Sequence, residues 1–211
     1  MEITNNKTGK PLEHYTAEYR GLEPYEAARR CGVSFDGARF GLTLYGHGVN
    51  ASWPDFRLEA AEPETCPAAL LSDYARILVL RYLLTGRDTG QAEPFLSYRE
   101  MPWGAVYEQQ FNGRCITRLA YGFGTRLDAF RSAAAGLGAV PIASKGDAAC
   151  ELTILGRAKM RMILYEPDEE FPPSSQILFS ANCADAFTAE DLAVAGDIVI
   201  SALKELAAAK R

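Results

Sequence analysis

The dipeptide Asp36-Gly37 restricts the fold more than any other feature of this sequence. It separates two short apolar segments, residues 33–35 and 40–44, and the second alternates apolar residues with small or polar ones. A tight hairpin turn requires positive φ, which glycine adopts readily. Residues 46–48, Gly-His-Gly, predict a second turn that leads to a third short strand. Links this short predict antiparallel pairing.

Apolar residues recur at helical spacing in several other segments. Residues 67–86 predict a helix that ends at Gly86. Its predicted buried face consists of Leu70, Tyr74, Ile77 and Leu84. Shorter helices are predicted in residues 22–32 and 126–138, and a closing helix is predicted to begin at Thr188, which can cap it.

Residues 101–124 combine a helical composition with Asn112-Gly113, a dipeptide typical of hairpin turns. The segments on either side of it lack the alternation of a strand, so we expect a helix that is broken or kinked near Gly113. Residues 150–167 predict two strands around Gly156, and residues 175–182 predict a further strand.

These elements predict an α+β protein. Strands joined in hairpins, with helices grouped between them, favour a small antiparallel sheet with flanking helices. We expect residues 13–211 to form a single domain, preceded by an N-terminal arm of residues 1–12.

The composition excludes some classes of function. A formal net charge of −5 argues against a broad nucleic-acid-binding surface. No apolar run approaches the ~18 residues that span a bilayer, and the polar start has no signal-peptide core. We therefore expect a cytoplasmic protein with neither nucleic acid nor membrane as a partner.

The five cysteines are widely spaced, and no Cys-x-x-Cys pair occurs. We expect reduced, mostly buried thiols, no metal site and no iron–sulfur cluster. They are Cys31, Cys66, Cys115, Cys150 and Cys183.

Three blocks of sequence, in this order, resemble one prokaryotic family, domain of unknown function 3786. They are residues 31–46, residues 83–86 with 95–124, and residues 165–182 followed by 190–203. The family is common in anaerobes, and some of its members carry a Cys-rich iron–sulfur module like those of corrinoid-dependent methyl-transfer systems. The resemblance implies anaerobic metabolism, near corrinoid or one-carbon chemistry, and no defined activity.

Residues Glu166 to Glu170 contain four carboxylates, with prolines at 167, 172 and 173. The carboxylates offer oxygen ligands for Mg²⁺ or Ca²⁺, but no glycine lies among them to permit a tight wrap around an ion. The prolines remove N–H donors, as suits a strand exit that must not continue pairing. A solvated corner is therefore favoured over a loop that lines a binding site, and over a metal site.

Arg114 and Arg118 lie one helical turn apart, and two guanidinium groups on one face suit a carboxylate or phosphate ligand. The alternative, which we favour, is an ion network with Glu100, Glu108 or the acidic loop. Should a cleft form, we expect it among residues 98–104, 113–118 and the acidic loop. The candidate ligand-binding residues are Arg99, Glu100, Trp103, Tyr107, Arg114, Arg118, Asp168 and Glu169.

Histidine chemistry is limited to His14 and His47. A Cys31–His47 dyad and an axial histidine ligand to a tetrapyrrole or corrinoid are both considered, and neither is favoured, because no motif indicates a cofactor.

The expected function is a non-catalytic ligand-binding or accessory module in anaerobic metabolism, with a small anionic ligand. The alternative is an enzyme acting on an anionic small molecule, with Glu100 or Glu169 as general acid or base and Arg114 or Arg118 as electrostatic stabiliser. A third candidate is a structural subunit that binds a partner protein through an apolar patch.

Overall fold

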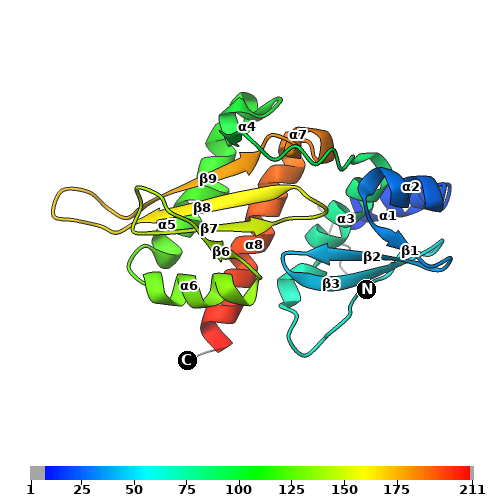
Figure 1. Cartoon of the computed structure of the whole chain (residues 1–211), viewed down its shortest axis with the longest axis horizontal. Helices are drawn as coiled ribbons and strands as arrows, with labels where there is room; N and C mark the ends of the chain where they lie inside the picture. Colours follow the sequence, from blue (N-terminus) through cyan, green and yellow to red (C-terminus); the bar gives the residue numbers. More distant parts are fainter. Residues whose placement is uncertain (1–7, 210–211) are drawn as a thin grey trace.

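The computed structural model describes residues 8–209, which form two antiparallel sheets with helices packed against them (Figure 1). The first sheet contains β1 (Ser34–Phe35), β2 (Arg39–Leu44), β3 (His47–Ser52) and β4 (Leu58–Ala60), paired in that order. Its apolar side chains face the helices α1 (Gly9–Tyr19), α2 (Pro24–Cys31) and α3 (Asp73–Thr85).

The predicted first hairpin is confirmed by the pairing of β1 with β2. At its turn, Gly37 has a φ of 97°, and the Asp36 carboxylate accepts hydrogen bonds from the N–H groups of Ala38 and Arg39, at 2.9 and 2.8 Å. Aspartate therefore closes the turn through its side chain, while glycine supplies the left-handed backbone conformation.

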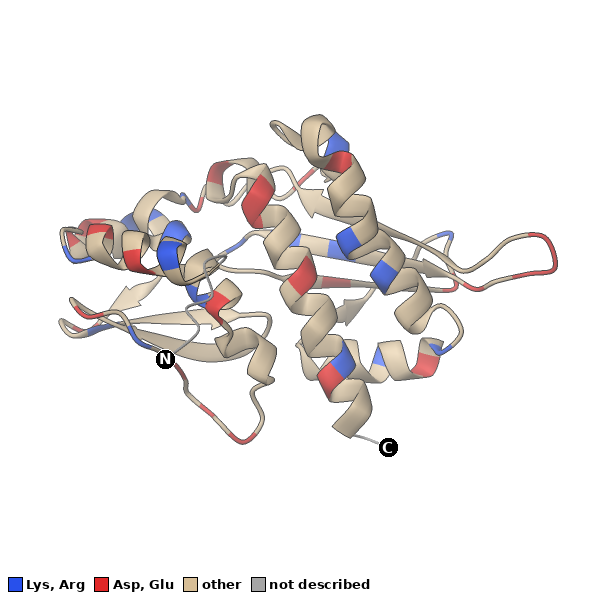
Figure 2. Ribbon diagram, turned by 180° about the vertical axis from the view of Figure 1, so that it is seen from behind, with Lys and Arg blue, Asp and Glu red and all other residues tan. Residues whose placement is uncertain are grey.

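The second sheet has the order β5-β9-β8-β7-β6. Its strands are β5 (Phe95–Ser97), β6 (Val140–Pro141), β7 (Ala148–Thr153), β8 (Lys159–Tyr165) and β9 (Ser174–Ser180). One face of this sheet is covered by helices (Figures 1 and 2). They are α4 (Gly104–Phe111), the π-helical turn η3 (Asn112–Ile116), α5 (Thr117–Phe123), α6 (Leu127–Gly136) and α8 (Ala189–Ala209).

The turn between β2 and β3 joins the two sheets. Tyr45, with a φ of 46°, donates a hydrogen bond from its buried hydroxyl to the carbonyl oxygen of Ala195 in α8, at 2.7 Å. The next residue, Gly46, has a φ of 76°, and a Cβ there would lie 2.5 Å from the carbonyl oxygen of Leu137. The buried apolar residues of both halves accordingly belong to one continuous core.

The predicted α+β class is confirmed, with the strands divided between two sheets rather than forming one. The helix predicted for residues 67–86 is also divided. A 3₁₀ turn, η1 (Ala68–Leu71), precedes α3, and the Ser72 hydroxyl caps α3 by accepting a hydrogen bond from the N–H of Ala75. Tyr74 is 39% exposed, so its predicted burial is wrong.

The predicted arm, residues 1–12, lies partly outside the described residues, and within them residues 9–12 form the first turn of α1. Two further short elements, η2 (Tyr98–Glu100) and α7 (Cys183–Ala186), complete the described chain. Among the described residues, no helix combines the length and apolarity needed to cross a membrane. All five cysteines are free thiols, and only Cys66 is not fully buried.

Candidate functional site

The helix predicted to break near Gly113 is confirmed as broken, and the break is a π-helical turn. Helix α4, the turn η3 and helix α5 follow one another without a gap, and we call residues 104–123 the broken helix. Insertions of this kind occur often at functional sites, because they re-aim the side chains of one turn. Figure 2 shows basic residues along the broken helix, beside α8.

Arg114 and Arg118 of the broken helix both bind Asp197 of α8. Arg114 donates from Nε and Nη2 to Oδ2 of Asp197, at 3.0 and 2.8 Å, and Arg118 donates from Nη1 to Oδ1. The second nitrogen of Arg118, Nη2, lies 3.4 Å from the Ser201 hydroxyl. Two guanidinium groups therefore share one carboxylate, and this group of three side chains keeps a surplus of one positive charge.

The expectation of an ion network at these arginines is confirmed, but the predicted partners are wrong. Glu108 pairs instead with Arg99, at 3.3 Å. Glu100 accepts hydrogen bonds from the N–H and the hydroxyl of Ser97, at 2.8 and 2.7 Å. These bonds, led by the one from the hydroxyl, hold the pKa of Glu100 below its ordinary value. Glu100 thus closes a turn, and it forms no ion pair with Arg114 or Arg118.

A small pocket of about 220 Å³ opens beside Arg114. Its wall is a stacked pair of rings, Tyr98 and Phe111, whose centroids are 4.0 Å apart and whose planes are parallel within 1°. Tyr107 stands at the rim and is 44% exposed. The Arg114 guanidinium carbon also lies 5.5 Å from the centroid of the Tyr74 ring, so this cation is flanked by aromatic groups.

Of the other candidate residues, Trp103 precedes α4 with a left-handed φ of 65° and is 77% exposed. Asp168 and Glu169 lie at the tip of the β8–β9 hairpin, which projects past the helices at the left of Figure 1. There Oδ1 of Asp168 accepts hydrogen bonds from the N–H groups of Glu170 and Phe171, at 2.9 and 2.7 Å. These local bonds support the interpretation of the tip as a solvated corner.

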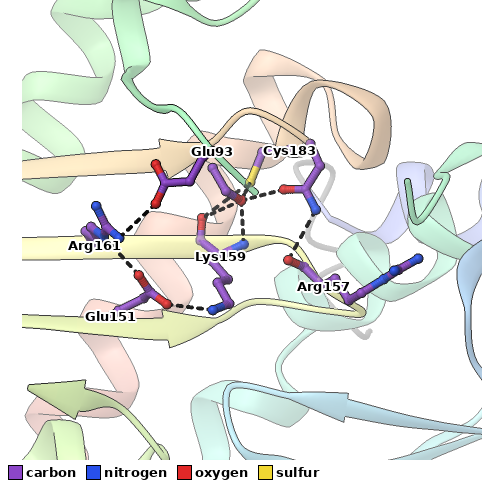
Figure 3. Close-up of polar contacts among 8 residues, drawn as sticks. Glu93, Glu151, Arg157, Lys159, Arg161 and Cys183 are labelled. Carbon is purple, nitrogen blue, oxygen red and sulfur yellow. Dashed lines mark hydrogen bonds and ion pairs between the residues drawn. The ribbon is translucent and has the colours of Figure 1, made fainter. Parts of the chain in front are cut away.

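The uncovered face of the second sheet carries a separate ionic network (Figure 3). Glu151 on β7 accepts hydrogen bonds from Lys159 at 2.6 Å and from Arg161 at 2.9 Å, and Arg161 also reaches Glu93 at 3.3 Å. Burial alone would raise the pKa of Glu151, but its bonds to these two cations outweigh burial and lower the pKa. Each cation is bound by carboxylate oxygen, so the network is internally satisfied.

Cys31 and His47 have different partners. The Cys31 thiol contacts the carbonyl oxygen of Tyr82 at 3.2 Å, and burial raises its pKa to about 11. Nε2 of His47 lies 3.1 Å from the carbonyl oxygen of Gly136. A thiol with this pKa is almost wholly protonated near neutral pH and is a poor nucleophile.

Sequence reasoning missed Asp197, although a signal was present. It is the only charged residue in the run from Leu192 to Leu203. A lone carboxylate inside an apolar helical run needs a cationic partner or solvent, so the run itself indicated a contact with arginine or lysine.

The fold is α+β, and the surface formed by the broken helix beside α8 is cationic and lined by aromatic side chains. A family model described as a domain of unknown function (DUF3786) matches residues 23–202, and the chain belongs to this family. No curated protein and no solved structure matches the chain.

Proposed function

We propose that this domain is a non-catalytic binding module of cytoplasmic metabolism that holds a small anionic ligand in the pocket beside Arg114. The observation that carries the proposal is the sharing of Asp197 between Arg114 and Arg118, which leaves positive charge uncompensated next to an aromatic wall. The anaerobic setting of the proposal rests on the family resemblance alone.

The chemistry of the pocket favours a flat carboxylate. The stacked rings of Tyr98 and Phe111 offer an apolar wall, and Tyr107 brings a phenol whose hydroxyl forms no hydrogen bond within residues 8–209. A guanidinium group binds a carboxylate through two parallel N–H donors. An aromatic carboxylate would therefore place its ring beside Tyr107, the exposed ring of the pocket, and its charge at Arg114.

The carboxylates near the pocket favour binding over proton transfer. Asp197 is held by two arginines, and Glu190 lies 3.7 Å from Arg81. Both oxygens of Asp197 already accept hydrogen bonds from guanidinium groups, so they are not free to take a proton from a bound ligand. This supports a binding role over the alternative of an enzyme.

The test is isothermal titration of the full chain with benzoate, and with benzamide as the neutral isostere. Benzoate is expected to bind and benzamide not to. Arg114→Gln should weaken benzoate binding by about tenfold or more, the scale of a charge-assisted hydrogen bond. Asp197→Asn should strengthen it, because the amide competes less for the guanidinium group.

Arg99→Gln is the matched control, because it removes the same charge from an exposed arginine that pairs only with Glu108 among the described residues. Equal affinities for benzoate and benzamide, or an unchanged affinity in Arg114→Gln, would reject the proposal. A purely structural role predicts that Arg114→Gln lowers the melting temperature with no effect on benzoate.

A further inference from the structure

The β8–β9 hairpin continues beyond the last pair of its ladder, Tyr165 with Ser174, and we call residues 166–173 the acidic tip. The acidic tip contains four carboxylates and no basic residue, and its Phe171 is 65% exposed. Its turn is closed by the N–H of Asp168, which donates to the carbonyl oxygen of Phe171 at 3.0 Å. Prolines fix φ on both sides of this turn, so the acidic tip needs little ordering when it binds a partner.

The acidic tip forms no ion pair with the described part of its own chain. The side chains of Glu166, Glu169 and Glu170 also form no hydrogen bond with residues 8–209, and Asp168 accepts only from N–H groups of the tip itself. Solvation accounts for the charges but not for the exposed ring of Phe171. Aromatic side chains are common anchors of protein interfaces. The acidic tip therefore has the composition of a docking element.

A surface of opposite charge lies at the end of α5. Arg118, Tyr121 and Gly122 are spaced at one helical turn on α5. Lys204 of α8 crosses over Gly122, where a Cβ atom would lie 3.2 Å from Cε of the lysine. Arg126 donates a hydrogen bond from Nη2 to the carbonyl oxygen of Gly122. We call Arg118, Tyr121, Arg126 and Lys204 the basic patch.

The basic patch is exposed and carries more positive than negative charge. Tyr121 is 67% exposed, and Arg126 and Lys204 are exposed and form no ion pair with residues 8–209. Arg118 has only a share of the Asp197 carboxylate. Burial lowers the pKa of Lys204, and the charges of Arg118 and Arg126 lower it further. A gathering of cations of this kind attracts carboxylates.

The carboxylates nearest to the basic patch do not neutralise it. Glu205 accepts a hydrogen bond from a backbone N–H of η1 at 3.2 Å, and Asp128 is paired with Arg131 at 2.9 Å. Glu166 lines the same hollow as Arg126 but forms no ion pair with it. The positive charge of the basic patch is thus available to another molecule.

The acidic tip and the basic patch lie at the same end of the molecule. The tip projects beyond the body on the side where α5 and α6 lie (Figures 1 and 2). At the base of the hairpin, Pro173 packs so closely on Gly124, the residue after α5, that a Cβ atom on the glycine would collide with Cβ of the proline. Two copies related by a two-fold axis can therefore each place a tip on the other's patch. Such an exchange is closed, because each copy offers both surfaces once.

We propose that the chain forms a weak two-fold dimer in which the acidic tip of each copy docks on the basic patch of the other. Carboxylates of the tip pair with Lys204 and Arg126, the cations without a carboxylate partner, and Phe171 packs against Tyr121. Two tips of eight residues each make a small interface, so the dimer forms reversibly. The dimer goes beyond the proposed ligand binding, since none of these residues lines the pocket beside Arg114.

The experiment is sedimentation velocity of the full chain over a concentration series, at low and at high salt. We expect a monomer–dimer equilibrium that high salt weakens, because salt screens exposed charges. Lys204→Glu and Glu170→Lys should each raise the dissociation constant by about tenfold or more, the scale of a charge-assisted hydrogen bond. Phe171→Ser should weaken the dimer at both salt concentrations, because an apolar contact is not screened.

A mixture of the two charge-reversed variants gives the sharpest measurement. In the mixed dimer, the unchanged tip of Lys204→Glu meets the unchanged patch of Glu170→Lys, and the reversed tip meets the reversed patch. The mixture should therefore dimerise at concentrations where neither variant does so alone, and this rescue also shows that both variants fold. Arg29→Glu, a charge reversal at an exposed residue of α2, is the matched control and should dimerise like the natural chain.

Three results would overturn the proposal. The first is a natural chain that stays monomeric at low salt over the whole series. The second is a mixture of the two variants that associates no better than either variant alone. The third is a dimer that both charge reversals leave intact, since its interface would lie on another surface. Arg114→Gln should leave the dimer unchanged, so loss of benzoate binding and loss of the dimer are separable.

Discussion

Gly196 of α8 and Cys115 of the π-helical turn approach so closely that a Cβ atom on Gly196 would lie 2.8 Å from Sγ of Cys115. The residues next to them in sequence are Asp197 and Arg114, which form an ion pair in which two nitrogens of Arg114 donate to Oδ2 of Asp197. The close contact of Gly196 with the Cys115 thiol thus lies directly beside the ion pair of Arg114 with Asp197.

Gly196→Ala should lower the free energy of unfolding. Overpacking of a core costs about 1–3 kcal/mol, which exceeds the gain of up to about 1 kcal/mol from replacing a helical glycine. Gly113→Ala is the control in the π-helical turn that Gly196 contacts, since a Cβ on Gly113 meets nothing within 4 Å. It should stabilise the protein by about 0.5–1 kcal/mol. Urea denaturation of both variants measures the difference, and a stabilised Gly196→Ala variant would contradict the packing argument.

Glu151→Gln should change how stability depends on pH. The folded protein holds the pKa of Glu151 below its ordinary value, so the carboxylate stabilises the fold above the unfolded pKa. That contribution is lost as the pH falls through the lowered folded pKa. The gap in melting temperature between the natural chain and the variant should therefore be largest near neutral pH and should close as the pH falls through the lowered pKa of the folded state.

Glu93→Gln provides the comparison for this network. Its carboxylate meets the same Arg161 but is 70% exposed, so the variant should show a much smaller gap across the pH range. A gap for Glu151→Gln that widens in acid would show that the two cations do not stabilise its ionised form.

The tip of the β8–β9 hairpin should be insensitive to loss of charge. Asp168→Asn keeps an oxygen that can accept from the N–H groups of Glu170 and Phe171, so the double change with Glu169→Gln should alter stability by less than about 0.5 kcal/mol. Mg²⁺ or Ca²⁺ should leave the melting temperature of the natural chain unchanged. A rise with either ion, abolished by the double change, would establish a metal site instead.

Cys66 should be the first thiol to react with iodoacetamide in the native protein. Burial raises the pKa of Cys115 and of Cys150 to about 12, and Cys31 and Cys183 are equally enclosed. Mass spectrometry after a short pulse at pH 8 should find label on Cys66 alone, and denaturant should expose all five. Rapid native labelling of Cys115 would mean that the π-helical turn opens readily.

The local elements were predictable from sequence because their signals are local. The Asp36-Gly37 turn, the strands around Gly156 and the break near Gly113 each follow from a few adjacent residues. The buried face of α3 was only partly predicted. A one-sided pattern placed Tyr74 inside, whereas Leu78, Val79, Leu80 and Leu83 are all fully buried. The helix packs against both α1 and α8, so its apolar surface is wider than one stripe.

The candidate site was less predictable than the fold. Arg114 and Arg118 were identified from their spacing, but their partner lies about eighty positions further on, and no local pattern encodes that pairing. Trp103 and Glu100 illustrate the same limit. The residue types suggested Trp103 as part of a binding site and Glu100 as a general acid or base. In the structure, Trp103 is exposed to solvent and Glu100 closes a turn.

The position of α8 in the sequence affects how the chain is made. This helix packs against α3, α5 and α6 and receives the hydroxyl of Tyr45, yet it follows all of them on the chain. During synthesis the earlier helices leave the ribosome with their apolar faces bare, and they stay so until residues 189–209 have emerged. A nascent chain stalled before α8 is thus a substrate for chaperones and proteases.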